Sequence, residues 1–155
     1  DILTLACLTA IVPAAFRHTD AESLSRVGVR RGEDLAGIAR WLASTNKHAA
    51  ALEMFHRAVE AGLPDKLLFR TLWEIAFLEK KLERPQAAFQ RFKELAGCRN
   101  EYRVAALEEL AKYYEHKERN YASALACTRQ ALGYKTSASL QRRLERLERR
   151  HAKTS

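Results

Sequence analysis

The side chains best suited to metal binding or catalysis are scattered through this chain of 155 residues. Its histidines show neither the HxxxH nor the HExxH spacing that places two metal ligands on one helix face. The sequence also lacks a Gly-rich phosphate loop, a GxSxG nucleophile motif and a CxxC pair. We therefore expect no metal, no other cofactor and no catalysis by these residues alone.

Basic side chains concentrate near the end of the chain. Residues 141–153 contain six basic and two acidic residues, which accounts for half of the net charge of +8. Such an excess attracts anionic partners. If this segment binds nucleic acid, the contacts come from its arginines, which are Arg142, Arg143, Arg146, Arg149 and Arg150. The alternative is an ordinary surface helix, because Leu140, Leu144 and Leu147 share one face and oppositely charged residues lie four apart.

The composition indicates which elements position these residues. Only six Gly and three Pro occur, while Ala, Leu, Glu, Arg and Lys recur throughout and no stretch alternates as a strand would. The hydrophobic content of 47% is enough to bury a continuous core. The sequence therefore predicts an all-α protein.

Small residues in this helical sequence recur with a period close to 36 residues. Ala51, Ala88 and Ala124 are 37 and 36 residues apart, and the positions seven residues later repeat that spacing as Ala58, Leu95 and Ala131. Two antiparallel helices approach closely where the facing side chain is no larger than Ala. The period therefore indicates a stack of helical hairpins.

This pattern resembles the tetratricopeptide-repeat (TPR) family over roughly residues 33–133, and the best match is the segment 107–132. The resemblance implies an α-α superhelix of about three TPR-like hairpins followed by a capping helix. The implied units are residues 32–64, 65–99 and 100–134, with the cap at 137–151. This sequence departs from the family at Glu79, where an aromatic residue is usual, and Ala replaces the usual Gly in all three first helices.

The TPR resemblance also implies a binding groove lined by the first helix of each hairpin. The matching positions are Arg40, Arg70, Trp73, Phe77, Lys80, Lys81, Lys112 and His116. Basic groups among aromatic rings suit an acidic peptide or a single-stranded nucleic acid. The carboxylate clamp of chaperone-binding TPR proteins is not reproduced, since its positions hold Ala36, Trp73 and Glu108. In the competing interpretation, Trp73 and Phe77 pack inside the protein and the lysines form a solvated face.

The first residues, DILTLACLTAIVPAAF, resemble the last helix of bacterial RNase H-like (DEDD-type) 3'-5' exonuclease domains. The resemblance implies that Asp1 is the last metal-binding carboxylate of a site whose other ligands lie upstream. Residues 1–31 are then a helical remnant of a preceding domain, and the alternative for Asp1 is a simple acidic helix start. We do not expect a membrane span, because the apolar stretch is short and contains Pro13.

Cys7, Cys98 and Cys127 are odd in number and lie in apolar helical patterns, which predicts buried, reduced thiols in a cytoplasmic protein. Two functions follow from the sequence. The leading expectation is a TPR-like scaffold for protein-protein interaction that forms the C-terminal accessory part of a larger protein. The alternative is a nucleic-acid-binding arm of an RNase H-like exonuclease.

Overall fold

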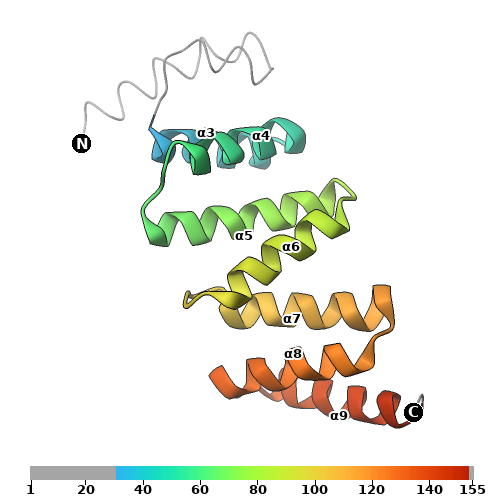
Figure 1. Cartoon of the computed structure of the whole chain (residues 1–155). Coiled ribbons are helices and arrows are strands. Elements are labelled where there is room, and N and C mark those ends of the chain that lie inside the picture. Colours follow the sequence, from blue (N-terminus) through green and yellow to red (C-terminus); the bar gives the residue numbers. More distant parts are fainter. Residues whose placement is uncertain (1–30, 154–155) are drawn as a thin grey trace. The chain divides into compact units, whose positions relative to one another are not determined.

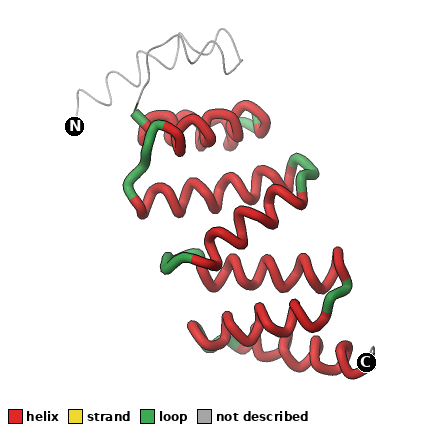
Figure 2. Tube along the Cα trace, viewed as in Figure 1, coloured by secondary structure: helices red, strands yellow, loops and turns green. Residues whose placement is uncertain are grey.

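A computed structural model describes residues 31–153. Those residues form seven α-helices and one π-helical turn and contain no strand, which confirms the predicted all-α class (Figure 2). The predicted helical segment 1–31 and the proposed metal ligand Asp1 lie almost entirely outside the described part and stay predictions. The helices are α3 (Gly32–Ser44), α4 (His48–Glu60), α5 (Asp65–Lys81), α6 (Pro85–Gly97), α7 (Arg103–Tyr113), the π-turn η1 (Tyr114–Glu118), α8 (Tyr121–Tyr134) and α9 (Ala138–Ala152).

The described residues divide into two compact units, one that ends at Leu68 and one that begins at Phe69, with the division inside α5. In the first unit α3 and α4 form a hairpin (Figure 1). Gly32 begins α3 against the end of α4, where a Cβ atom would lie only 2.2 Å from the carbonyl oxygen of Gly62. Only a glycine fits that contact without a shift of the backbone.

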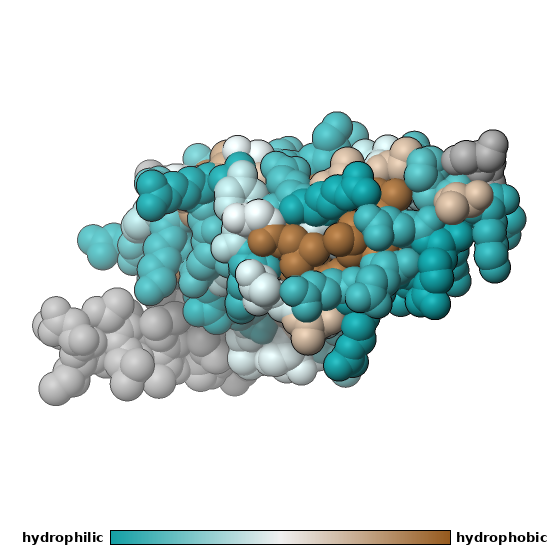
Figure 3. Space-filling model, turned by 90° about the horizontal axis from the view of Figure 1, so that it is seen from below, coloured by the Kyte–Doolittle hydropathy of each residue, from teal (hydrophilic) through white to brown (hydrophobic). Residues whose placement is uncertain are grey.

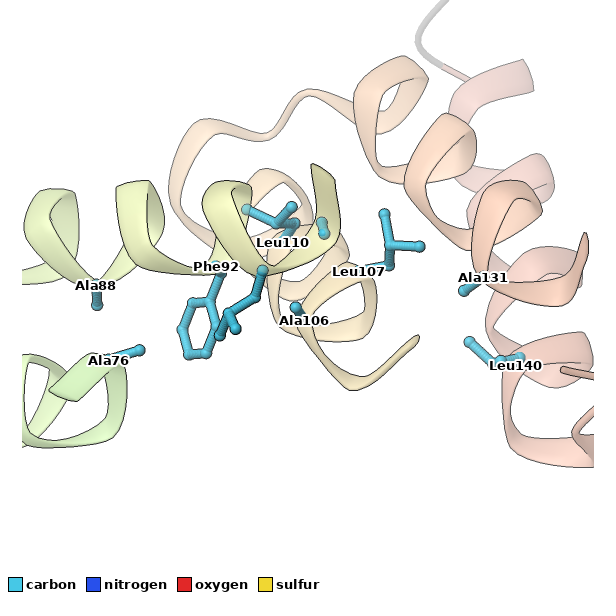
Figure 4. Close-up of a cluster of buried hydrophobic side chains, with 10 residues drawn as sticks. Ala76, Ala88, Phe92, Ala106, Leu107, Leu110, Ala131 and Leu140 are labelled. Atoms are coloured by element: carbon cyan, nitrogen blue, oxygen red, sulfur yellow. The ribbon is translucent and has the colours of Figure 1, made fainter. Parts of the chain in front are cut away.

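In the second unit, successive helices run back and forth from α5 to α8, and α9 packs against α8 (Figure 1). One hydrophobic cluster connects α5, α6 and α7 through side chains such as Ala76, Phe92 and Leu107, and extends to α8 and α9 at Ala131 and Leu140 (Figure 4). A second, smaller cluster joins Leu125 of α8 to Leu147 of α9, with Leu144 partly buried against it. This core fixes the elements that carry the candidate site.

The positions that repeat along the sequence are buried. Ala51, Ala88 and Ala124 are at most 2% exposed, and so are their companions seven residues later, which are Ala58, Leu95 and Ala131. Each set takes one residue from α4, one from α6 and one from α8. The 36- to 37-residue period therefore marks equivalent buried positions on three helices.

Two residues whose types suit N-capping do not lie directly before a helix. Asp65 is itself the first residue of α5, and Asn100 lies three residues before the start of α7 at Arg103. Asn100 instead accepts a hydrogen bond from the backbone N–H of Tyr102 in the preceding turn, at 2.8 Å. Asn120 is the residue that caps a helix, because its side chain accepts from the backbone N–H of Ser123 at 3.0 Å.

The cysteines also differ from the expectation. Cys98 is exposed, because it follows the end of α6 in an extended conformation, and Cys127 is only partly buried. Burial raises the pKa of the Cys127 thiol above its ordinary value. Among residues 31–153, no helix is long and apolar enough to cross a membrane.

Candidate binding site

A pocket opens in the second unit between the end of α5, the first half of α6 and the end of α7 with η1. Its volume is about 180 Å³. Apolar side chains supply much of its lining, and basic side chains come from three of the four elements. The lining residues are Lys80, Pro85, Ala88, Phe89, Phe92, Glu109, Lys112, Tyr113, His116 and Lys117. We refer to this set as the pocket.

Glu109 binds two of the lysines that line the pocket. Lys80 Nζ donates to Glu109 Oε2 at 2.6 Å, and Lys112 Nζ donates to Oε1 of the same carboxylate. The Glu109 side chain is 9% exposed, whereas both lysines remain more than 40% exposed. Burial alone would raise the pKa of Glu109, but the hydrogen bonds from Lys112 and Lys80 outweigh burial and hold this pKa below its ordinary value.

Four aromatic rings form a cluster beside the pocket. Trp73 lies 4.8 Å from Phe77, 5.6 Å from Phe92 and 5.3 Å from the stacked ring of Tyr102, measured between ring centroids. Phe92 belongs to both the cluster and the pocket. Trp73 therefore contributes to packing. Phe77, in contrast, is 37% exposed, and the Lys80 ammonium lies 5.2 Å from the centroid of its ring.

The structure brings together three of the eight groove residues that the TPR resemblance implies. Lys80, Lys112 and His116 line the pocket, and Phe77 lies next to it. Arg70 pairs instead with Glu74, at 3.2 Å, on the surface of α5. The other predicted groove residues outside the pocket are Trp73, Lys81, which is exposed at the end of α5, and Arg40, which belongs to α3 in the first unit.

Sequence reasoning missed Glu109, Lys117 and the rings from α6 that complete the pocket. Glu109 lies three residues before Lys112, and that spacing signals an ion pair on one helix. Lys117 lies in the π-turn, where a helical turn holds more residues than in an α-helix. The α-helical period therefore does not predict which way its side chain points. Phe92 belongs to the hydrophobic cluster of this unit and Phe89 packs against it, and both also line the pocket.

A second charged group lies where η1 meets α9. Glu115, whose side chain is 0% exposed, accepts hydrogen bonds from Arg143, Arg146 and Arg150 at 2.8 to 3.2 Å. Arg146 binds it twice, through Nε and Nη2. Burial alone would raise the pKa of Glu115, but the hydrogen bond and charge of Arg146, with the neighbouring cations, hold it below its ordinary value. We call these four residues the Glu115 cluster.

The remaining arginines of α9 face solvent. Arg142 and Arg149 are exposed, and Arg149 contacts only its own helix, through the backbone oxygen of Glu145. Glu148 pairs with Arg129 of α8 at 2.9 Å. Figure 3 views the molecule from the side of α8 and α9, where hydrophilic residues cover most of the surface around a short hydrophobic band. Of the five arginines considered for nucleic-acid binding, three therefore also hold α9 in place.

Residues 31–153 contain no group of three or more His, Cys, Asp or Glu side chains that could hold a metal ion. At the pocket, the Lys80 and Lys112 ammonium groups pair with the Glu109 carboxylate beside an apolar lining. That arrangement suits recognition of an anionic, partly apolar ligand.

Comparison with known proteins finds no family model that matches this chain. The chain is similar to the uncharacterized protein YprB of Bacillus subtilis (strain 168), with 29% identity over 122 residues. The similarity covers 74% of this chain but only 29% of YprB, so the chain spans less than a third of that relative. The description of YprB states no activity.

Proposed function

We propose that this chain is a TPR-like scaffold without catalytic activity of its own, and that its second unit holds an acidic segment of a protein partner. The observation that carries the proposal is the pocket, in which an apolar lining lies among three lysines and one histidine. The 36- to 37-residue repeat of buried small positions supports the TPR-like character.

The volume of the pocket suits one side chain of the partner. At about 180 Å³ it is similar to the apolar cavity of about 150 Å³ that holds a benzene ring. Phe89, Phe92 and Tyr113 offer ring faces and edges to such a group. We propose that the partner inserts one Phe or Leu side chain.

The charges around the pocket determine which residues of the partner can lie next to the inserted side chain. Lys80 and Lys112 share one carboxylate, Glu109, and both ammonium groups keep exposed donors. Lys117 is exposed and has no acidic partner among the described residues. The pocket therefore has a net positive charge, and a partner with Asp or Glu next to its apolar side chain fits it.

The chain also fits a role as one part of a larger protein. YprB extends well beyond the region of similarity, and the opening residues resemble the last helix of an RNase H-like exonuclease domain. We propose that this chain is the C-terminal accessory part of such a protein, with Asp1 as the last metal ligand of the upstream site. A divalent-metal-dependent nuclease activity of these 155 residues alone would contradict the proposal.

A fluorescent peptide with one Phe between acidic residues tests the pocket. We expect the full chain to bind it, and binding to weaken about fivefold for Lys117→Glu, since reversing a nearby charge costs on the order of 1 kcal/mol. Lys135→Glu makes the same change of charge at an exposed position outside the pocket and should have little effect.

Two further peptides complete the test. Replacing the Phe with Ala should remove most of the binding, and replacing the acidic residues with their amides should do the same. The pocket is not the site if Lys117→Glu and Lys135→Glu weaken binding equally, or if the Phe can be replaced without loss.

A further inference from the structure

We propose that the exposed basic face of α9 binds the phosphate backbone of single-stranded nucleic acid, at a surface separate from the pocket. The face consists of Arg142, Arg146, Arg149, Arg150 and Lys153, which recur at the three- and four-residue spacing of one helix side. No residue of α9 lines the pocket. We call these five residues the α9 stripe.

The α9 stripe has the length of a short run of phosphates. At 1.5 Å per residue, positions 142 to 153 extend over about 16 Å of helix. That length is enough to span several phosphates of a single strand. An extended polyanion can therefore contact the whole stripe.

The hydrogen bonds of the Glu115 cluster hold two side chains of the stripe in place before a ligand binds. Arg146 and Arg150 are hydrogen-bonded to Glu115, yet their side chains remain 42% and 46% exposed. Arg146 donates two of its five N–H groups to the carboxylate, which leaves the others for a ligand. Because these side chains are already ordered, an incoming phosphate does not have to immobilise them.

The local charge favours an anion at this place. Three guanidinium groups surround the single carboxylate of Glu115, and His116 lies 3.8 Å from the same carboxylate. The acidic residues of α9 offset this excess only in part, since Glu148 pairs with Arg129 and Glu145 lies beside the stripe. A bound phosphate relieves the repulsion between neighbouring guanidinium groups.

The composition of the stripe suits nucleic acid, which offers an arginine bases on which to stack as well as phosphates. Four of its five members are arginines, whose planar forks bind phosphate oxygens in pairs and stack on bases. The pocket, in contrast, uses lysines around an apolar lining. The two surfaces thus differ in the ligand that they suit.

Binding of a fluorescent oligothymidylate of roughly fifteen nucleotides to the full chain, followed by anisotropy over a range of salt concentrations, tests the inference. The variant Arg142→Gln/Arg149→Gln/Lys153→Gln removes three charges of the stripe that do not touch Glu115. Its matched control is Lys81→Gln/Arg99→Gln/Lys135→Gln, which removes three exposed charges elsewhere in the same unit.

We expect the wild-type chain to bind more weakly as salt rises. The stripe variant should reduce the slope of log K against log salt by about two, at roughly 0.7 per phosphate contact, and weaken binding at low salt at least tenfold. The control variant should change the slope by less than half as much. The stripe variant should bind the acidic peptide like wild type, so the stripe and the pocket succeed or fail separately.

Three outcomes would overturn the inference. The first is an absence of wild-type binding at about 50 mM salt. The second is equal weakening by the stripe and control variants, which would indicate general attraction to a basic protein. The third is equal competition by polyglutamate of the same charge, which would show that the stripe does not distinguish phosphate from carboxylate.

Discussion

Glu109 and Glu115 are buried carboxylates six residues apart, and the regions around them differ in the cations that surround them. Two lysines from α5 and α7 bind Glu109 beside an open pocket. Three arginines from α9 bind Glu115 and fasten that helix to η1. A buried glutamate therefore lies beside an open pocket in one region and inside a contact between two helical elements in the other.

The difference follows from the shapes of the two cations. An ammonium is a compact charge on a flexible stem, so Lys80 and Lys112 can satisfy Glu109 and still turn toward a ligand. A guanidinium is a rigid fork, and Arg146 uses it to bind both oxygens of Glu115. Arg143 is only 17% exposed and is committed to the contact. We infer that the region around Glu115 is the more rigid of the two.

The largest expected effect comes from breaking the more rigid region. Glu115→Gln leaves three arginines around a neutral amide, and we expect the free energy of unfolding to fall by about 3 kcal/mol. Urea unfolding at neutral pH measures the loss. Glu118→Gln, an exposed position in the same π-turn, is the control and should change stability by less than about 0.5 kcal/mol.

The wild-type protein and Glu115→Gln should also differ in how their stability changes in acid. Because the folded pKa of Glu115 lies below its ordinary value, its stabilising contribution is present above the unfolded pKa of about 4.3 and is lost as pH falls through the folded pKa. Wild-type stability should therefore fall in acid more steeply than that of Glu115→Gln. Parallel acid profiles for the two proteins would show that Glu115 is not held ionised by the arginines.

An intermediate effect is expected at the pocket. Glu109→Gln removes the only acidic side chain among the pocket residues, so we expect the acidic peptide to bind about fivefold more tightly. Stability should fall by only about 1 kcal/mol, because both lysines are solvated once released. Anisotropy and urea unfolding measure the two changes. Weaker peptide binding in a folded variant would mean that Glu109 orients the lysines for the ligand.

The smallest effect concerns Glu79, a buried carboxylate with one oxygen that has no hydrogen-bond partner. Burial raises its pKa, despite the opposing charges of Arg91 and Arg84. Its stabilising contribution is therefore complete below the unfolded pKa and is lost as pH rises through the folded pKa, the reverse of Glu115. Glu79→Gln should stabilise the protein by about 0.5 kcal/mol at pH 7 and by less near pH 4. Thermal unfolding at both pH values decides this, and an equal gain at each would contradict the raised pKa.

The helices could be predicted from the sequence because they depend on local signals. Pro85 begins α6, the turn from Gly62 to Pro64 separates α4 from α5, and the repeated alanines occupy buried positions. The long-range ion pairs could not be predicted, since the partners of Glu115 lie 28 to 35 residues along the chain and Lys80 lies 29 residues before Glu109. Of the ion pairs of these two carboxylates with lysine and arginine, only that of Glu109 with Lys112 has a local spacing that signals it.

The π-turn from Tyr114 to Glu118 fits one residue more into a helical turn than an α-helix does. Without that wider turn, the extra residue would rotate the side chains after it by about 100° around the helix axis. The wider turn is therefore compatible with the burial of Ala124 and Ala131 of α8 at the positions that repeat in the other hairpins. A relative that lacks this extra residue would present a different side chain at the place of Glu115, and its last helix would require another means of attachment.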